Sequence, residues 1–114
     1  MSAWVRRAGA MAAIVIVLSL ATRLWGERIG INRGQGWDGE TYVQWAADFP
    51  HQMFDLGTTT YHAQRVLPSA VVHYAMKAVG ARPTVPNILV GFHVLDTLML
   101  VLAAILWARI CDEM

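Results

Sequence analysis

The sequence predicts an all-α membrane protein with two to three transmembrane helices, and three observations support this. Of the 114 residues, 56% are hydrophobic and only 15% are charged, whereas a soluble domain of this size needs more charge to keep its surface in water. The mean hydropathy is +0.42. The apolar residues are gathered into blocks around one polar loop, as in a chain that enters a bilayer. We expect residues 1–114 to form a single membrane domain.

The first transmembrane helix is expected at residues 8–25. No charged residue interrupts positions 8–22, and a helix of about 18 residues covers about 27 Å, close to the hydrocarbon thickness of a bilayer. Trp4 and Trp25 bracket this stretch, as aromatic anchors at the two interfaces do.

A second interpretation of the same stretch stays open. Arg6 and Arg7 precede the apolar run, and small residues follow it at Ser19 and Ala21, which is the pattern of a secretory signal peptide. Cleavage after residue 21 would leave a secreted protein with one C-terminal anchor.

Residues 26–64 are expected to form a polar loop that carries a short helix. Apolar residues recur there at i, i+3, i+4 and i+7, which is one face of a helix: Tyr42, Trp45, Ala46 and Phe49. Pro50 ends this pattern. We therefore predict a short amphipathic helix at about 39–48 that lies on the membrane surface with its aromatic face toward lipid.

Two more apolar segments follow the loop, at residues 65–80 and 86–110. The 15 residues 66–80 of the first segment reach only about 22 Å as a helix, so it is predicted to be a short, tilted or half-buried span. The second is long enough to cross a bilayer. Basic residues without acidic neighbours precede residue 8 and lie between the two segments, which favours a cytoplasmic N-terminus, an extracytoplasmic loop and an outer C-terminus.

Charge and cysteine content exclude several classes of function. The net charge of +1 gives no electrostatic basis for binding nucleic acid. The single cysteine, Cys111, excludes an internal disulfide framework and a cysteine-based zinc site. His51 and Asp55 could meet on one helical turn near His62 and bind a divalent metal, but no third ligand is fixed in place. We therefore assign no metal-binding residue, and the cofactor stays open.

Asp38 is the first candidate for chemistry. It lies between glycines just outside the first predicted span, where its carboxylate could act as a general base or a metal ligand. It also directly precedes the predicted helix at 39–48, where Asp is a preferred N-cap. The two roles are compatible.

Arg65 stands where the chain is expected to re-enter the membrane. A guanidinium there suits the paired oxygens of a phosphate or pyrophosphate, although an arginine can also extend to lipid head groups at such a place. Tyr61, His62 and Gln64 bring further hydrogen-bonding groups to the same point in the chain.

His93 and Asp96 lie three residues apart, on one face of the third apolar segment. An ionisable residue inside a span is expensive to bury and is therefore a functional candidate. The other interpretation is a hydrogen bond to a neighbouring helix.

Two motifs resemble the GT-C superfamily, whose members are multi-spanning glycosyltransferases that use polyprenyl-phosphate sugars. The loop opens in a way that is similar to the first outer loop of these enzymes, with Trp37-Asp38-Gly39-x-x-Tyr42. The second apolar segment resembles the start of the second helix in bacterial mannosyltransferase-like members, with Gln64-Arg65-Val66-Leu67-Pro68. The resemblance covers nearly the whole chain but only the N-terminal share of a family member.

The resemblance implies a membrane-embedded glycosyltransferase-like protein, or its N-terminal segment, at the outer face of a bacterial inner membrane. Asp38 would engage the acceptor or a metal, and Arg65 would lie near the lipid phosphate. Tyr42, Tyr61 and Gln64 are the other expected substrate-binding residues. The expected partners are the bilayer, the polyprenyl-phosphate sugar and further transmembrane helices, without which 114 residues are not expected to be active. The alternative is a small non-catalytic membrane subunit that docks partner helices.

Overall fold

The computed structural model describes residues 2–114, and this part of the chain contains helices and turns but no strand. The prediction of an all-α protein is confirmed. The chain divides into two compact units, one formed by the residues up to Glu27 with Asp96–Met114, the other by Arg28–Leu95. The elements in chain order are α1 (Ala3–Trp25), η1 (Ile31–Gly34), α2 (Gly39–Ala47), η2 (His51–Asp55), α3 (Thr60–Ala63), α4 (Val66–Ala78) and α5 (Val85–Glu113).

Two helices, α1 with 23 residues and α5 with 29, are long and apolar enough to cross a membrane. They contain the predicted spans 8–25 and 86–110 and extend beyond both. Only 6% of the most apolar stretch of either helix is buried inside the protein. Apolar side chains that point outward in this way suit lipid rather than water.

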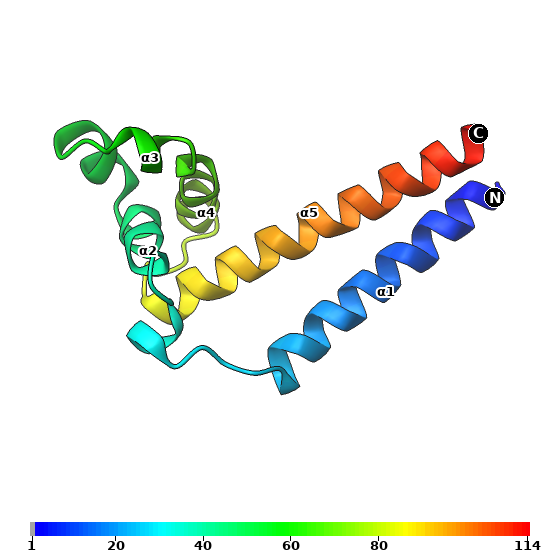
Figure 1. Ribbon diagram of the computed structural model, residues 1–114, viewed down its shortest axis with the longest axis horizontal. Helices are drawn as coiled ribbons and strands as arrows, with labels where there is room; N and C mark the ends of the chain where they lie inside the picture. The colour runs from blue at the N-terminus through cyan, green and yellow to red at the C-terminus, as the bar shows by residue number, and fades with distance from the viewer. Residues whose placement is uncertain (1) are drawn as a thin grey trace. The chain divides into compact units, whose positions relative to one another are not determined.

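The first unit pairs α1 with the C-terminal part of α5, and the two helices run side by side in opposite directions (Figure 1). The hydroxyls of Ser19 and Thr97 are hydrogen-bonded at 2.5 Å. Near the chain ends, the guanidinium of Arg109 lies 5.2 Å from the centre of the Trp4 ring. Polar contacts of this kind are a common means of holding helices together in a bilayer.

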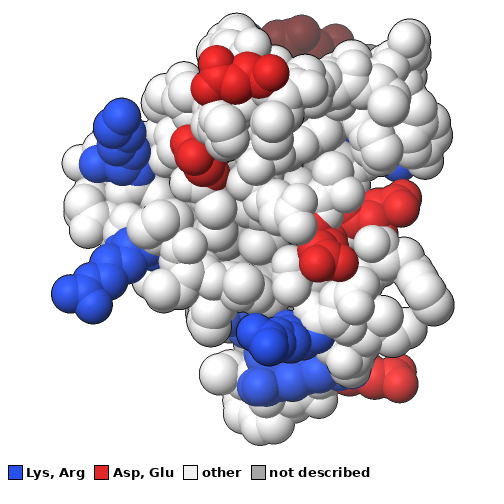
Figure 2. Space-filling view, turned by 90° about the vertical axis from the view of Figure 1, so that its left-hand side faces the viewer, with Lys and Arg blue, Asp and Glu red and all other residues white. Residues whose placement is uncertain are grey.

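Charged side chains contribute little to holding the second unit together. His51 and Asp55 pair at 2.8 Å one turn apart, and both are exposed to solvent, so the pair adds little stability. On the face seen in Figure 2 most of the surface is uncharged, and the basic and acidic groups form only small patches. The unit must therefore depend mainly on apolar packing.

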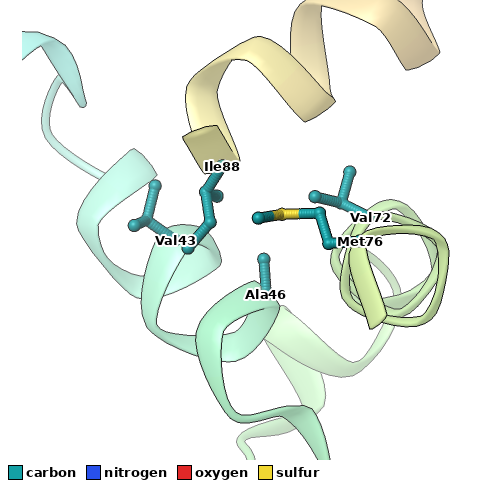
Figure 3. Packing of buried hydrophobic residues seen from close by; sticks show 5 residues of the cluster. All are labelled: Val43, Ala46, Val72, Met76 and Ile88. Atoms are coloured by element: carbon teal, nitrogen blue, oxygen red, sulfur yellow. The ribbon is translucent and has the colours of Figure 1, made fainter. Parts of the chain in front are cut away.

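The core of the second unit lies where α2, α4 and the start of α5 meet. Ile88 is fully buried, and it packs with four further apolar side chains (Figure 3): Val43, Ala46, Val72 and Met76. Gly91 brings α4 and α5 close together, because a Cβ there would lie 2.8 Å from Cγ1 of Val72.

Two hydrogen bonds fix α4 along α2. The buried hydroxyl of Ser69 donates to the carbonyl of Tyr42 at 3.1 Å. Nδ1 of His73 lies 2.9 Å from the carbonyl oxygen of Ala46. Because a carbonyl can only accept, this nitrogen carries the proton.

The predicted helix at 39–48 is present as α2, but its aromatic face is covered by protein and not left free for lipid. Trp45 is 5% exposed and Phe49 8%. The Phe49 ring lies 6.1 Å from the Tyr74 ring of α4, and Trp45 lies 5.7 Å from the ring of His62. Side chains of α3 and α4 thus take the place that lipid was expected to fill.

The predicted span at 65–80 corresponds to α4, a helix of 13 residues. At 1.5 Å per residue it is about 20 Å long, well short of the hydrocarbon core of a bilayer. That this segment crosses the membrane stays a prediction.

Candidate functional site

An open pocket of about 340 Å³ lies in the second unit, between α2, the start of α4 and α5. Three of the substrate-binding residues predicted from the sequence line it: Tyr42, Gln64 and Arg65. Gln64 and Arg65 are neighbours in the chain, whereas Tyr42 lies 22 residues before Gln64, and the packing of α4 on α2 brings Tyr42 to them. The remaining lining residues are Pro68, Ser69 and Phe92.

A tight turn before α4 sets the position of Arg65. The Thr59 hydroxyl accepts a hydrogen bond from the backbone N–H of His62 at 3.4 Å and caps α3. The backbone N–H of Arg65 then donates to the carbonyl of His62 at 2.8 Å. The guanidinium lies 5.0 Å from the centre of the Tyr61 ring, so an aromatic face supports the charged group.

The surroundings of Arg65 raise its pKa above the ordinary arginine value. The largest cause is the neighbouring Tyr42 hydroxyl, followed by the charge interaction with Tyr61, and the charge of Asp38 makes the smallest contribution. Arg65 is exposed, and no carboxylate of the described residues forms a salt bridge with it. Among the described residues its positive charge is therefore not neutralised by a salt bridge.

Tyr42 contributes a buried hydroxyl at the pocket. Its hydroxyl is buried and has no hydrogen-bond partner among the described residues. The charged group on which it acts is the Arg65 guanidinium, whose pKa it raises. A ligand atom in the pocket would give this hydroxyl a hydrogen-bond partner.

Asp38 occupies the N-cap position of α2, but its side chain makes no capping hydrogen bond. Asp38 therefore has the position of an N-cap residue, but its side chain does not form the hydrogen bond of one. The residue is exposed and does not line the pocket, yet its charge is near enough to act on Arg65. The carboxylate is thus available for chemistry beside the pocket.

The other candidate residues do not gather into one site. His51 bonds Asp55, while Nδ1 of His62 lies 2.9 Å from the Thr59 hydroxyl. Among residues 2–114 no group of three or more His, Cys, Asp or Glu side chains could hold a metal ion. His93 is half-buried in the second unit, and Asp96 is exposed at the start of the first unit's part of α5.

Ser69 and Phe92 line the pocket but were not predicted from the sequence as site residues. Ser69 lies four residues after Arg65, so one helical turn brings it to the same side of the chain, and this spacing could have indicated it. Phe92 reaches the pocket only because α5 packs on α2 and α4, for which no local signal exists.

Comparisons of the chain with family models, with curated proteins and with solved structures gave no match.

Proposed function

We propose that the chain is a glycosyltransferase-like membrane protein, or its N-terminal segment, that transfers a sugar from a polyprenyl-phosphate donor at the outer face of the cytoplasmic membrane. One observation carries this proposal: the Arg65 guanidinium stands without a carboxylate partner at an open pocket whose wall includes Tyr42 and Gln64. This is a suitable receptor for a phosphate group. The two helices long enough to cross a bilayer would hold it near lipid.

The proposed reaction breaks the bond between the sugar's anomeric carbon and the phosphate oxygen and forms a bond to an acceptor hydroxyl. The electron pair of the broken bond leaves with the phosphate, so negative charge grows there in the transition state. Arg65 stabilises this charge, and the Tyr61 ring holds the guanidinium in place. Asp38 orients the acceptor hydroxyl and takes its proton.

The pocket volume agrees with a ligand head group. Sites for small molecules occupy about 300–1,000 Å³, and the pocket at about 340 Å³ is at the small end of this range. A sugar phosphate fits this size, whereas a polyprenyl chain must lie outside the pocket. The donor would therefore have its head in the second unit and its tail in the bilayer.

The test uses the full chain, with any partner it is purified with, reconstituted in liposomes that contain a polyprenyl-phosphate mannose. Binding of this donor and transfer of its sugar are measured separately. We expect Arg65→Gln to weaken donor binding at least tenfold, and Arg65→Lys to restore it only in part because the paired donors are lost. Arg33→Gln in η1 is the matched control and should leave binding unchanged.

Asp38→Asn separates catalysis from binding. We expect transfer to fall by 10²–10⁴-fold, the usual contribution of a positioned proton acceptor, while donor binding stays within twofold. Full transfer activity in Asp38→Asn would refute the catalytic assignment. Unchanged binding in Arg65→Gln would refute the phosphate site.

A non-catalytic subunit is the second candidate, and Asp96 is the observation that favours it. This carboxylate is exposed on an apolar helix that could cross a membrane, and such residues usually pair with a neighbouring helix. If Asp96→Leu releases copurifying membrane proteins while Asp38→Asn has no effect, the subunit function is supported instead.

A further inference from the structure

We infer that the outward face of α4 is a membrane-docking surface. Through this face the helix lies on an anionic bilayer and does not cross it. Leu67, Val71 and Tyr74 follow each other at i, i+4 and i+7 and form one stripe along the helix. They are 70%, 42% and 49% exposed. The opposite side of α4, with Ser69 and Val72, is buried in the second unit. The helix therefore has two apolar sides, and protein covers only one of them.

The charges around this stripe identify its partner as an anionic surface. No Asp or Glu occurs from residue 56 to residue 95, so the stripe has no acidic neighbour in its own segment. Lys77 at the end of α4 and Arg82 in the following turn are basic and exposed. Apolar side chains flanked by basic ones are the pattern of a helix that lies in the head-group region of an anionic membrane.

The exposed side of α2 has the opposite character. Glu40, Gln44 and Asp48 recur at four-residue spacing and are all exposed, so they form a polar, acidic stripe. Because α2 is buried against α4 through its other side, this stripe points away from α4. The second unit thus has one side that suits lipid and another that suits water.

The direction of α4 also favours a position along the bilayer surface. In Figure 1 α4 is seen nearly end-on, whereas the N-terminal part of α5, with which it packs, runs across the picture. Within the second unit the two helices therefore run in different directions, and α4 does not lie alongside the start of α5 as a parallel span would.

This inference changes the topology predicted from the sequence. If α4 stays on one surface, the turn at 79–84 lies on the same side as the loop at 26–64. The chain then crosses the bilayer twice, through α1 and α5, and both termini lie on one side.

Spin labels can measure the depth of α4 directly. Cys111 is the only cysteine, so Cys111→Ser gives a background for single-cysteine variants of the full chain. Leu67→Cys, Val71→Cys and Ala78→Cys place a nitroxide along the stripe, and Gln44→Cys places one on α2 as the control. The protein is reconstituted in phosphatidylcholine liposomes with phosphatidylglycerol, and collisions with oxygen and with a water-soluble nickel chelate are measured.

We expect the three labels on α4 to collide mainly with oxygen and to report the same shallow depth. The label at Gln44→Cys should collide mainly with nickel. A depth that passes through the bilayer centre between residues 67 and 78 would overturn the inference in favour of a span. Nickel access at residue 71, or a label immobilised and shielded from both reagents, would overturn it in favour of water or a protein partner.

Whether the surface requires basic residues and anionic lipid is tested in the Val71→Cys background. Adding Lys77→Gln and Arg82→Gln, or omitting phosphatidylglycerol, should move the label toward water and raise its collision rate with nickel at least twofold. Arg33→Gln, which removes a charge of the second unit from η1, should not change it. An unchanged rate in the double variant would show that the surface does not recognise anionic lipid.

Discussion

Replacing Gly91 by alanine tests the contact between α4 and α5 that positions the pocket. The added Cβ would lie 2.8 Å from Cγ1 of Val72, about 0.6 Å closer than the 3.4 Å at which ordinary contact begins. Val72 is 2% exposed and β-branched, so it cannot rotate away easily. Overpacking of this kind costs about 1–3 kcal/mol, against a gain of about 1 kcal/mol from replacing glycine in a helix.

A double-mutant cycle separates these two terms. Val72→Ala removes the methyl group with which the new Cβ collides, so Gly91→Ala should be stabilising by about 1 kcal/mol in that background. The coupling energy between the two substitutions should therefore be about 1–3 kcal/mol. Gly9→Ala is the matched control in α1, because nothing lies within 4 Å of the added Cβ there.

Amide hydrogen exchange of α4 in the reconstituted protein is the assay, since it reports the opening of this unit alone. A cost of one to two kcal/mol speeds exchange by a factor of about 5–30. Gly91→Ala should slow exchange when Val72 is alanine, and Gly9→Ala should leave α4 unchanged. If Gly91→Ala has the same effect with valine and with alanine at position 72, the close approach of the two helices is refuted.

Three further predictions concern the same unit. Ile88→Ala should destabilise it by about 2–5 kcal/mol, because a fully buried side chain leaves a cavity, and exchange of α2 and α4 should rise together. Ser69→Ala removes the bond to the Tyr42 carbonyl and should cost about 0.5–1.5 kcal/mol, measured as a lower Tm; an unchanged Tm would show that the bond is not formed. Asp38→Ala should change the stability by less than about 0.5 kcal/mol, because the Asp38 side chain makes no capping bond, and a larger loss in the same assay would restore the capping role.

The long helices were predictable because a long apolar run is sufficient to indicate a candidate span. The helix α2 was predictable from the spacing of Tyr42, Trp45 and Phe49. That spacing shows that one face is apolar, but it is the same whether lipid or protein covers the face. The covering of α2 by α4 depends on tertiary packing, so the spacing alone led to the prediction of lipid there.

The candidate site was also predictable only in part, because tertiary packing decides which residues line the pocket. Arg65, Gln64 and Tyr42 were selected because of their residue types and their places beside apolar segments, and they line one pocket. Phe92 was missed because its role depends on how α5 packs against α2. For Asp38 the sequence left two roles open, that of a general base or metal ligand and that of an N-cap. Its side chain forms no capping hydrogen bond, so the structure does not support the second role.

The close approach of α4 and α5 at Gly91 also limits the width of the pocket. Phe92, which lines the pocket, directly follows Gly91 in the chain. A Cβ at position 91 would lie 2.8 Å from Cγ1 of Val72, so any side chain there would push this part of α5 away from α4 and would carry Phe92 with it. The glycine therefore fixes the distance between the walls of the pocket as well as the packing of the unit.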